Sequence, residues 1–411
     1  MKERILVFSE KLYPYGGGAQ FALNLLLKSL KEEFEICIVT LCDLKPIYKK
    51  EYYEDIKIFN LAEVKSIPGS QLSLFLTTFY YRGFIEKLIS KCDVVYIADT
   101  WIAPAMIAKK IGKPVVKSFH SLANVNYFTA PWEEVEYTNL LGLIKSVVKV
   151  CGLYGKSTLL KIIEPPYAIL LDKLSKTIVR SFIDIAVSPS IAMKNVLDHM
   201  LAGRVLCIPN LLPEEPYIKL HNVEERARTF IYIGGKSYQK GFYHLMQTLV
   251  SYARNLQVLA NRKRIVFELV DILSTTDVSV KQYKFGNTVI RLRTRLNRTN
   301  LMKLFEKVHV AIVPSICFES FCYAVIEAQL WGRAVIASRI GGIPEIVEDN
   351  VTGFLVTPGS HSELLEKINL FCDLDESEVI NMGLRARKFL LKKMDNQRLI
   401  RKWIRLFESV S

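Results

Sequence analysis

Two glutamates with seven residues between them give this 411-residue chain its clearest chemical signal. Glu319 follows a predicted buried strand, and Glu327 is the one charged residue between Phe321 and Trp331. That apolar segment predicts a helix that begins near Phe321 and stops by Gly332. A carboxylate in such a helix is costly to bury unless something donates hydrogen bonds to it. The donors are either protein groups or ligand hydroxyls, and ligand hydroxyls would account for both carboxylates.

Two glycine-rich loops are candidate phosphate-binding elements. Gly16, Gly17 and Gly18 follow the first predicted strand and open the first helix, while Gly341 and Gly342 follow a later strand. Glycine lets a backbone approach a ligand closely, and a helix N-terminus supplies unpaired N–H groups with a positive dipole end. A turn that only reverses the chain is the alternative. The first loop lacks the later glycine of the dinucleotide fingerprint GxGxxG.

A lysine-bearing loop follows the first strand in the second half of the chain. Lys236 and Lys240 on this loop could neutralise a diphosphate, or they could be solvated surface lysines. Residues 155–157 and 235–237 both read Gly-Lys-Ser, as a P-loop does, but both lack the earlier glycine of that motif. The sequence therefore excludes a Walker-type NTPase.

One histidine lies where a reactive group is expected. His120 follows the predicted strand 115–119, at the rim where α/β sheets collect their functional side chains. A structural role is as compatible with this position as a reactive one. For a metal, only Asp373-Leu374-Asp375 resembles a metal-binding DxD, and it falls in a predicted helix connection far from the other candidates. We expect no metal.

The elements that position these residues are short apolar strands alternating with helices. The pattern runs through the first half of the chain and restarts near Thr229, which predicts two doubly wound parallel sheets. Residues 209–216 hold three prolines and predict the linker. We therefore predict an α/β protein with Rossmann-like domains at 1–208 and 209–389. A basic helix at about 390–411 is expected to pack back on the first domain.

The stretch 139–180 breaks this alternation. It intersperses lysines with leucine and isoleucine, as an amphipathic helix at a membrane interface does. Helices whose lysine stems cover a core would show the same pattern. We read it as a helical insertion, with an anionic membrane surface as a candidate partner.

Charge and cysteine content narrow the class of protein. The chain has 55 Lys and Arg against 41 Asp and Glu, and this net charge of +14 attracts polyanions without choosing among them. The eight cysteines form no CxxC pair, which favours a reducing cytosol. No window reaches the ~18 uncharged apolar residues of a membrane span. We expect a cytoplasmic protein with no nucleic acid partner.

With these residues in place, the chain resembles family 4 of the retaining GT-B glycosyltransferases. Glu319 and Glu327 form the family's E-x7-E signature, and residues 341–347 and 351–356 follow its pattern closely. The resemblance covers both domains and is most specific in the second. It implies two Rossmann-like domains that face a central cleft.

The resemblance also implies roles for residues of the second domain. Glu319 would contact the donor sugar, and Glu327 would bind the ribose of the nucleotide. Backbone N–H groups near Phe321 and Cys322 would hold the diphosphate, and Ser320 belongs to the same donor-binding set.

The resemblance implies roles for further positions, one of which departs from the family's pattern. The loop 16–18 would also hold the diphosphate, and His120 would lie beside the reacting sugar. Lys240 matches the lysine of the family's phosphate loop, but the arginine usual five residues earlier is here Gly235. Lys236, one place along, would substitute with a point charge.

The implied reaction is transfer of a hexose-type sugar from a nucleotide-sugar to a saccharide or lipid-linked acceptor. Lysines and backbone N–H groups can stabilise the leaving diphosphate without a metal, and no cofactor is implied. The leaving phosphate oxygen would take the acceptor's proton. Two alternatives remain: a GT-B nucleotide-sugar epimerase, against which the E-x7-E signature weighs, and a catalytically decayed basic binding protein, which the substitution at Gly235 favours.

Overall fold

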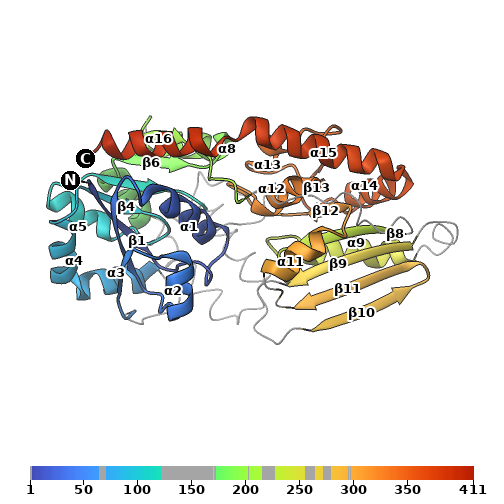
Figure 1. Cartoon of the computed structure of the whole chain (residues 1–411), viewed down its shortest axis with the longest axis horizontal. Helices are drawn as coiled ribbons and strands as arrows, with labels where there is room; N and C mark the ends of the chain where they lie inside the picture. The colour runs from blue at the N-terminus through green and yellow to red at the C-terminus, as the bar shows by residue number, and fades with distance from the viewer. Residues whose placement is uncertain are drawn as a thin grey trace. The chain divides into compact units, whose positions relative to one another are not determined.

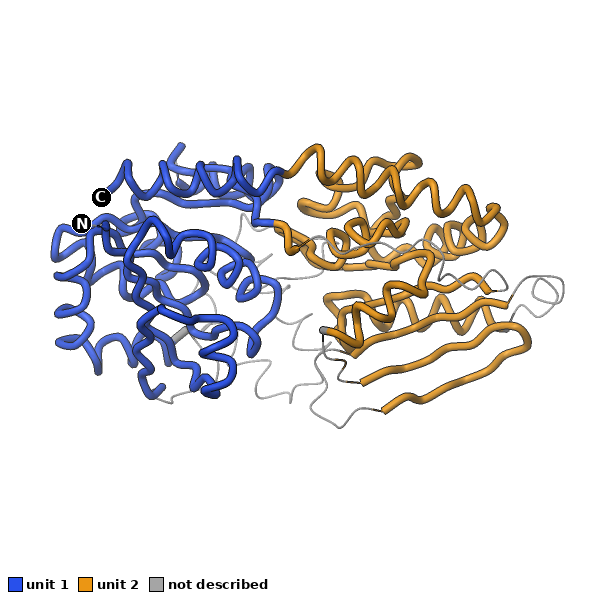
Figure 2. Tube along the Cα trace, in the orientation of Figure 1, with its two compact units in different colours: residues 1–211, 395–411 blue, residues 212–394 orange. Residues whose placement is uncertain are grey.

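The computed structural model describes residues 2–63, 71–121, 170, 173–201, 203–214, 227–254, 264–271, 279–294, 296 and 298–411. The chain divides into two compact units (Figure 2). Unit 1 comprises Met1–Leu211 and Asp395–Ser411, and unit 2 comprises Leu212–Met394. The second unit thus begins inside the predicted linker, and the chain returns to the first unit before it ends.

Unit 1 is built on a parallel sheet of seven strands in the order β3-β2-β1-β4-β5-β6-β7 (Figure 1). Its strands are β1 (Arg4–Ser9), β2 (Glu35–Thr40), β3 (Lys57–Asn60), β4 (Val94–Ile97), β5 (Val115–Ser118), β6 (Ile185–Ser188) and β7 (Val205–Cys207). The bounded helices are α1 (Gly18–Leu30), α2 (Pro46–Tyr52), α3 (Gln71–Tyr80), α4 (Arg82–Ile89), α5 (Pro104–Lys110), α8 (Ile191–Leu201) and α16 (Asn396–Glu408). Strand order reverses between β1 and β4, so ligand-binding groups are expected at the carboxyl ends of these two strands.

Unit 2 repeats this topology with one antiparallel edge strand, in the order β10-β11-β9-β8-β12-β13-β14. Its strands are β8 (Ala227–Ile233), β9 (Arg264–Asp271), β10 (Val280–Phe285), β11 (Thr288–Thr294), β12 (Val310–Val313), β13 (Ala334–Ser338) and β14 (Gly353–Val356). The helices are α9 (Phe242–Arg254), α11 (Arg298–Phe305), α12 (Tyr323–Leu330), α13 (Ile343–Ile346), α14 (His361–Asp373) and α15 (Glu376–Lys393). The reversal here lies between β8 and β12.

The core of unit 2 forms on one face of its sheet. Alternate residues of β8 and β9, such as Phe230 and Phe267, stack with ring centroids 5.0 Å apart. Leu245 of α9 and Ile368 of α14 are fully buried in the same cluster. Each fully buried side chain of this size contributes about 1.5–3 kcal/mol to stability, so this cluster is a major source of the stability of unit 2.

The last helix, α16, belongs to unit 1. The rings of Trp403 and Phe407 lie 5.7 Å and 5.6 Å from that of Tyr96 on β4, and Phe407 also packs edge-on against Phe34. The basic residues of α16 face solvent, among them Arg401 and Lys402. The amphipathic pattern therefore packs one face of the helix against β4 of the sheet and leaves the charged face hydrated.

The two doubly wound sheets predicted from the sequence are confirmed, but four strands, β3, β7, β10 and β14, were not predicted. β10 is exposed along its whole length and mixes polar with apolar residues, so it lacks the apolar run of a buried strand. β3 and β7 are short and partly exposed. α12 begins at Tyr323, two residues after the predicted Phe321. Most of the insertion 139–180 lies outside the described residues, and 173–182 are helical.

Gly383 in α15 provides a test of packing in unit 2. A Cβ built there would lie 2.0 Å from the carbonyl oxygen of Gly332, so the helix can approach only without a side chain. We expect Gly383→Ala to destabilise unit 2 by about 1–3 kcal/mol, as overpacking does. Gly83 in α4 is the control, since a Cβ at that position would meet nothing within 4 Å. Gly83→Ala should stabilise unit 1 by about 0.5–1 kcal/mol through helix propensity. Thermal unfolding of both variants measures these changes in stability. Equal changes at the two positions would contradict the role of close packing at Gly383.

Candidate functional site

Glu319 has the best-defined surroundings of the candidate site residues in unit 2. Its side chain is 8% exposed, and its Oε1 accepts hydrogen bonds from Ser315 Oγ at 2.6 Å and from Lys240 Nζ at 2.6 Å. Ser315 is itself fully buried. A buried carboxylate needs such donors, since an unpaired one would cost several kcal/mol. The structure thus brings together two predicted site residues that are 79 positions apart in the chain.

Lys240 is the solvent-facing partner in this pair. Its side chain is 43% exposed, in contrast to that of Glu319. Burial opposes its charge, but the negative charge of Glu319 and the hydrogen bond to that carboxylate outweigh this effect and raise the pKa of Lys240. The ammonium group therefore stays charged at neutral pH while it remains open to an anionic ligand.

Two glycines let three loops converge on Glu319. Gly241, with φ +74°, packs so closely that a Cβ would lie 1.8 Å from the carbonyl oxygen of Pro314. Gly341, with φ +56°, would place a Cβ 2.2 Å from the carbonyl oxygen of Glu319. The N–H of Gly342 donates to that same oxygen at 2.7 Å. Any other residue at 241 or 341 would have to push the backbone of the glutamate loop away.

The position where the resemblance led us to expect arginine has its own constraint. Gly235 adopts φ +67°, and its carbonyl oxygen accepts a hydrogen bond from Tyr232 Oη at 2.8 Å. Residues with side chains rarely adopt this left-handed conformation. Lys236, the next residue, is exposed on the same loop. The local backbone thus disfavours arginine at position 235 and leaves Lys236 as a neighbouring cation.

The start of α12 lies beside Glu319. Its N-cap, Cys322, makes no side-chain capping hydrogen bond, so the first N–H groups of the helix are not capped by that residue. Burial, followed by the charge of Glu319, raises the pKa of the Cys322 thiol to about 12, and that of Cys317 likewise to about 12. Both cysteines are neutral thiols at physiological pH. Ser320 is buried and Phe321 half-buried in the same turn.

Glu327 lies further along α12, half-buried. It borders a small cavity with Trp331 and with Met302 and Phe305 of α11. The described hydrogen bonds of Glu319 run to Ser315 and Lys240, so the two glutamates of the signature have different surroundings. The structure places Glu319 in the ion pair on the loop before α12 and Glu327 on α12 itself.

The glycine loop of unit 1 precedes α1 as predicted. Gly17 is the N-cap, and its N–H donates to Gln20 Oε1 at 3.0 Å. A Cβ at Gly17 would meet nothing within 4 Å, whereas one at Gly16 would collide with the side chain of Gln20. Packing within unit 1 therefore gives a reason for glycine at position 16 and none at position 17.

His120 follows β5 and neighbours a buried lysine. Burial, together with the charge of Lys117, lowers the pKa of His120 to about 4, so its imidazole is neutral at pH 7. Lys117 is only 1% exposed, and burial lowers its pKa to about 7 against the opposing charge of Asp99. Its Nζ donates to the backbone oxygen of Asp99 and lies 4.6 Å from the ring centroid of Phe119.

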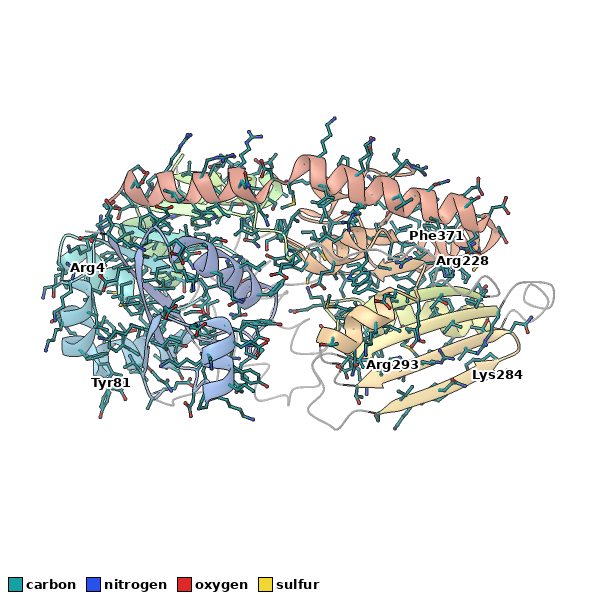
Figure 3. The ribbon with its side chains drawn as sticks, viewed as in Figure 1. Arg4, Tyr81, Arg228, Lys284, Arg293 and Phe371 are labelled. Carbon is teal, nitrogen blue, oxygen red and sulfur yellow. The ribbon has the colours of Figure 1, made fainter. Side chains whose placement is uncertain are left out.

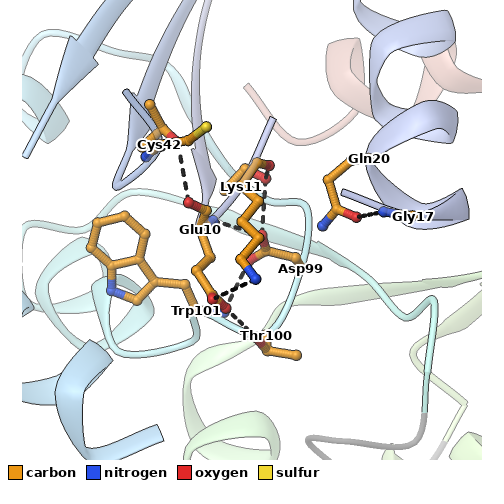
Figure 4. Close-up of polar contacts among 10 residues, drawn as sticks. Glu10, Lys11, Gly17, Gln20, Cys42, Asp99, Thr100 and Trp101 are labelled. Carbon is orange, nitrogen blue, oxygen red and sulfur yellow. Dashed lines mark hydrogen bonds and ion pairs between the residues drawn. The ribbon is translucent and has the colours of Figure 1, made fainter. Parts of the chain in front are cut away.

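Two carboxylates that the sequence analysis missed flank the reversal of strand order in unit 1 (Figure 4). Glu10 follows β1 and Asp99 follows β4. Asp99 accepts hydrogen bonds from Ser9 Oγ at 2.9 Å, from the N–H of Glu10 at 2.6 Å and from the N–H of Trp101 at 3.1 Å. Burial raises the pKa of both carboxyl groups, and for Glu10 the charge of Asp99 adds to the effect. The strand-edge rule that singled out His120 would have found them too.

The remaining sequence predictions concern metals and membranes. Asp373 ends α14 and Asp375 caps α15, so the DxD-like triplet joins two helices as expected. Within the described ranges, no group of three or more His, Cys, Asp or Glu side chains is arranged to hold a metal ion. Of the described helices, none is both long and apolar enough to cross a lipid bilayer.

The comparison with known families concerns the unit that holds Glu319 and Lys240. Residues 214–389 match the family model described as Glycosyl transferases group 1. This part of the chain is similar to members of that family. The matched segment contains Lys240, Glu319, Glu327 and the loop at Gly341.

Curated relatives match part of the chain. The chain is 28% identical over 170 residues to a lipopolysaccharide 1,2-N-acetylglucosaminetransferase of Salmonella typhimurium, covering 38% of this chain and 42% of that protein. It is 25% identical over 207 residues to an alpha-maltose-1-phosphate synthase of Mycolicibacterium smegmatis, covering 48% and 52%. The matches thus span about half the length of these relatives.

Solved structures extend the likeness to the whole chain. HepE of Anabaena, crystallised with UDP and glucose, superposes with a TM-score of 0.67 at 17% identity over 98% of this chain and 99% of that one. Sucrose-phosphate synthase from Thermosynechococcus elongatus gives 0.70 at 15% identity over 99% of each chain. At these identities the likeness establishes the fold, which is that of GT-B glycosyltransferases.

The buried lysine of unit 1 predicts a pH effect on stability. Between pH 7 and about 10.4 the folded state has lost the Lys117 proton that the unfolded chain still binds, so the free energy of unfolding should rise with pH. The slope is at most about 1.4 kcal/mol per pH unit. Lys117→Met should remove this rise, while exposed Lys110→Met should keep it. Urea unfolding at pH 6, 7.5 and 9 tests this prediction. It would be contradicted if the free energies of unfolding of the wild type and of Lys117→Met differed by the same amount at every pH.

Proposed function

We propose that the chain is a retaining glycosyltransferase that moves a hexose-type sugar from a nucleotide-sugar donor to a saccharide or lipid-linked acceptor without an essential metal. The observation that carries this proposal is the pairing of buried Glu319 with solvent-facing Lys240 beside the start of α12, within a group 1 domain. One anionic and one cationic group at a helix N-terminus suit a ligand that joins a sugar to a diphosphate.

On the donor side, the diphosphate would interact with Lys240 and with the first N–H groups of α12. Charge on the departing diphosphate grows as the bond to the sugar breaks, and fixed positive groups stabilise that charge. Glu319 keeps one oxygen, Oε2, free of the hydrogen bonds described above, and this oxygen can accept a sugar hydroxyl. Lys236 adds charge without the fork of an arginine.

UDP is the nucleotide we propose to try first. HepE has been crystallised as complexes with UDP and glucose and with UDP-glucose. In this chain Glu327 would hydrogen-bond the ribose, as the family resemblance implies. A carboxylate that binds hydroxyls contributes about 1–3 kcal/mol.

On the acceptor side, His120 and the loop at Gly17 are the proposed elements of unit 1. A neutral imidazole can donate or accept a hydrogen bond but carries no charge, so His120 would orient a sugar hydroxyl rather than bind a phosphate. The open space at Gly17 would let a ligand meet the backbone. A lipid-linked acceptor and an anionic membrane surface stay predictions, because the insertion that suggested them is mostly outside the described residues.

A decayed binding protein is the competing function, and Gly235 is the observation that favours it. A panel of UDP-, GDP- and ADP-sugars tests both functions by thermal shift, followed by calorimetry and product analysis with candidate saccharides. We expect one nucleotide class to bind, and transfer to proceed with retained anomeric configuration in the presence of EDTA. Binding with no transfer to any acceptor would favour the decayed scaffold, and an inverted product would refute the retaining mechanism.

Glu327 gives a prediction on donor binding. We expect Glu327→Ala to weaken nucleotide-sugar binding by about 1–3 kcal/mol, the value of charged hydrogen bonds to ribose hydroxyls. Calorimetry with the nucleotide-sugar and the free nucleotide measures it, and both should weaken equally. Exposed Glu366→Ala on α14 is the control. Unchanged affinity in a folded Glu327→Ala variant would refute the assignment.

Lys240 gives a prediction on turnover. Lys240→Ala should lower kcat more than it weakens donor binding, because the diphosphate gains charge in the transition state. The expected loss in kcat is on the order of 100-fold, which corresponds to removing one fixed charge from the reacting centre. Steady-state kinetics and calorimetry on the same variant separate the two effects. Equal losses would mean that the lysine binds ground state and transition state alike.

A further inference from the structure

A second cavity of unit 2 lies away from the Glu319 site. It has a volume of about 620 Å³ and opens on the sheet face bordered by α11. Its lining comes from β8, β9, β10 and β11, from α11 and from the turn after that helix. Neither Lys240 nor Glu319 is part of it. Cavities of about 300–1,000 Å³ are of the size that holds small molecules.

The described lining of this cavity is strongly basic. It contains five cationic side chains and one carboxylate, that of Glu268. The five cations are Arg264, Arg291, Arg293, Lys303 and Lys307. Four positive charges therefore remain uncompensated within one concave surface. Concave surfaces of one sign concentrate ions of the opposite sign.

Glu268 fixes two of these cations in place. It is 2% exposed, its Oε1 accepts from Arg291 Nη1 at 2.8 Å, and its Oε2 accepts from Arg293 Nε at 2.6 Å. Gln282 of β10 accepts from Arg291 Nε at 3.0 Å. The side chains of Arg291 and Arg293 are still 27% and 23% exposed. Both guanidinium groups are thus oriented by the protein and keep N–H groups for a ligand.

Strand alternation puts these groups on one face. Phe267 and Ile290 point into the apolar core, so Glu268, Arg291 and Arg293 point to the opposite face. Arg293 is labelled on β11, near α11, in Figure 3. A structural explanation needs one arginine to neutralise Glu268. It does not account for the second arginine or for Arg264 and the two lysines.

We propose that this cavity binds a small molecule that carries two or more phosphate groups. Arginine forks match phosphate oxygens, and the lysines on α11 supply further charge at the rim. The concave shape limits the size of the ligand. No aromatic side chain occurs among the described lining residues, whereas surfaces that bind single-stranded nucleic acid use aromatic rings to stack bases. The site is separate from the proposed donor site and does not depend on the proposed transfer reaction.

The test uses tripolyphosphate as the probe, titrated by calorimetry into the full chain. Lys303 and Lys307 are exposed, so Lys303→Gln/Lys307→Gln should fold normally and weaken the cavity's binding event at least fivefold. The matched control is Lys388→Gln/Lys392→Gln, which removes two exposed lysines from α15 in the same unit. It should change affinity less than twofold. If the two double variants weaken tripolyphosphate binding equally, the loss of net positive charge explains the effect and the proposal is wrong.

Two further measurements distinguish this site from the donor site and from a site that binds a nucleic acid polymer. Lys240→Gln should leave the cavity's binding event in place, and its loss in that variant would assign the binding to the donor site instead. A single-stranded oligonucleotide that binds more tightly than tripolyphosphate, with the same dependence on Lys303 and Lys307, would overturn the small-molecule class. If the Arg293→Gln variant and the Lys303→Gln/Lys307→Gln variant both retain tripolyphosphate binding, the proposed site is wrong.

Discussion

The burial of one carboxylate organises the functional side of unit 2. Glu319 can be excluded from water because Ser315 and Lys240 donate to it at 2.6 Å each. Those donors reach it because Gly241 and Gly341 allow the adjoining backbones to approach within contact distance. Ile316 N–H also donates to the carbonyl oxygen of Gln239, which ties the lysine loop to the glutamate loop. Removing any one member would leave a buried polar group unpaired or force two loops apart.

The same topology serves both units in different ways. In each sheet the strand order reverses once, and the loops at that point carry the polar groups. In unit 2 a charged lysine faces solvent beside a buried glutamate. In unit 1 the lysine, Lys117, is the buried partner, with a pKa of about 7, and the carboxylates Glu10 and Asp99 follow the strands β1 and β4. One unit thus offers positive charge to a ligand, and the other offers neutral or weakly charged groups.

This contrast fits the proposed function, in which unit 2 binds an anionic donor and unit 1 contributes groups that bind sugar hydroxyls. Fixed cations and N–H groups are suited to phosphate oxygens, whereas a neutral histidine is suited to hydroxyls. The basic cavity under α11 lies outside this division, because its residues belong to the sheet face and not to the strand ends. The basic side chains of this cavity make up part of the chain's excess of lysine and arginine over acidic residues.

The sequence by itself determined the two doubly wound sheets and the glycine loop at residues 16–18, and it singled out Glu319 and Lys240 as candidate site residues. Short apolar runs between helices can bury their backbone only as parallel strands, so that pattern specifies the fold class. The motif at Glu319 was recognisable because its residues are contiguous. In contrast, the pairing of Lys240 with Glu319 and the basic lining beneath α11 involve residues far apart in the chain.

Only the tertiary structure decided which of these residues meet. Glu10 and Asp99 become neighbours through the order of β1 and β4, and Arg291 and Arg293 reach Glu268 through the register of β11 with β9. β10 was not predicted because an exposed edge strand needs no apolar run. The pKa of Lys117 likewise follows from burial, which depends on every element packed around it. Such long-range proximity and desolvation have no local pattern, because they arise from packing rather than from neighbouring residue types.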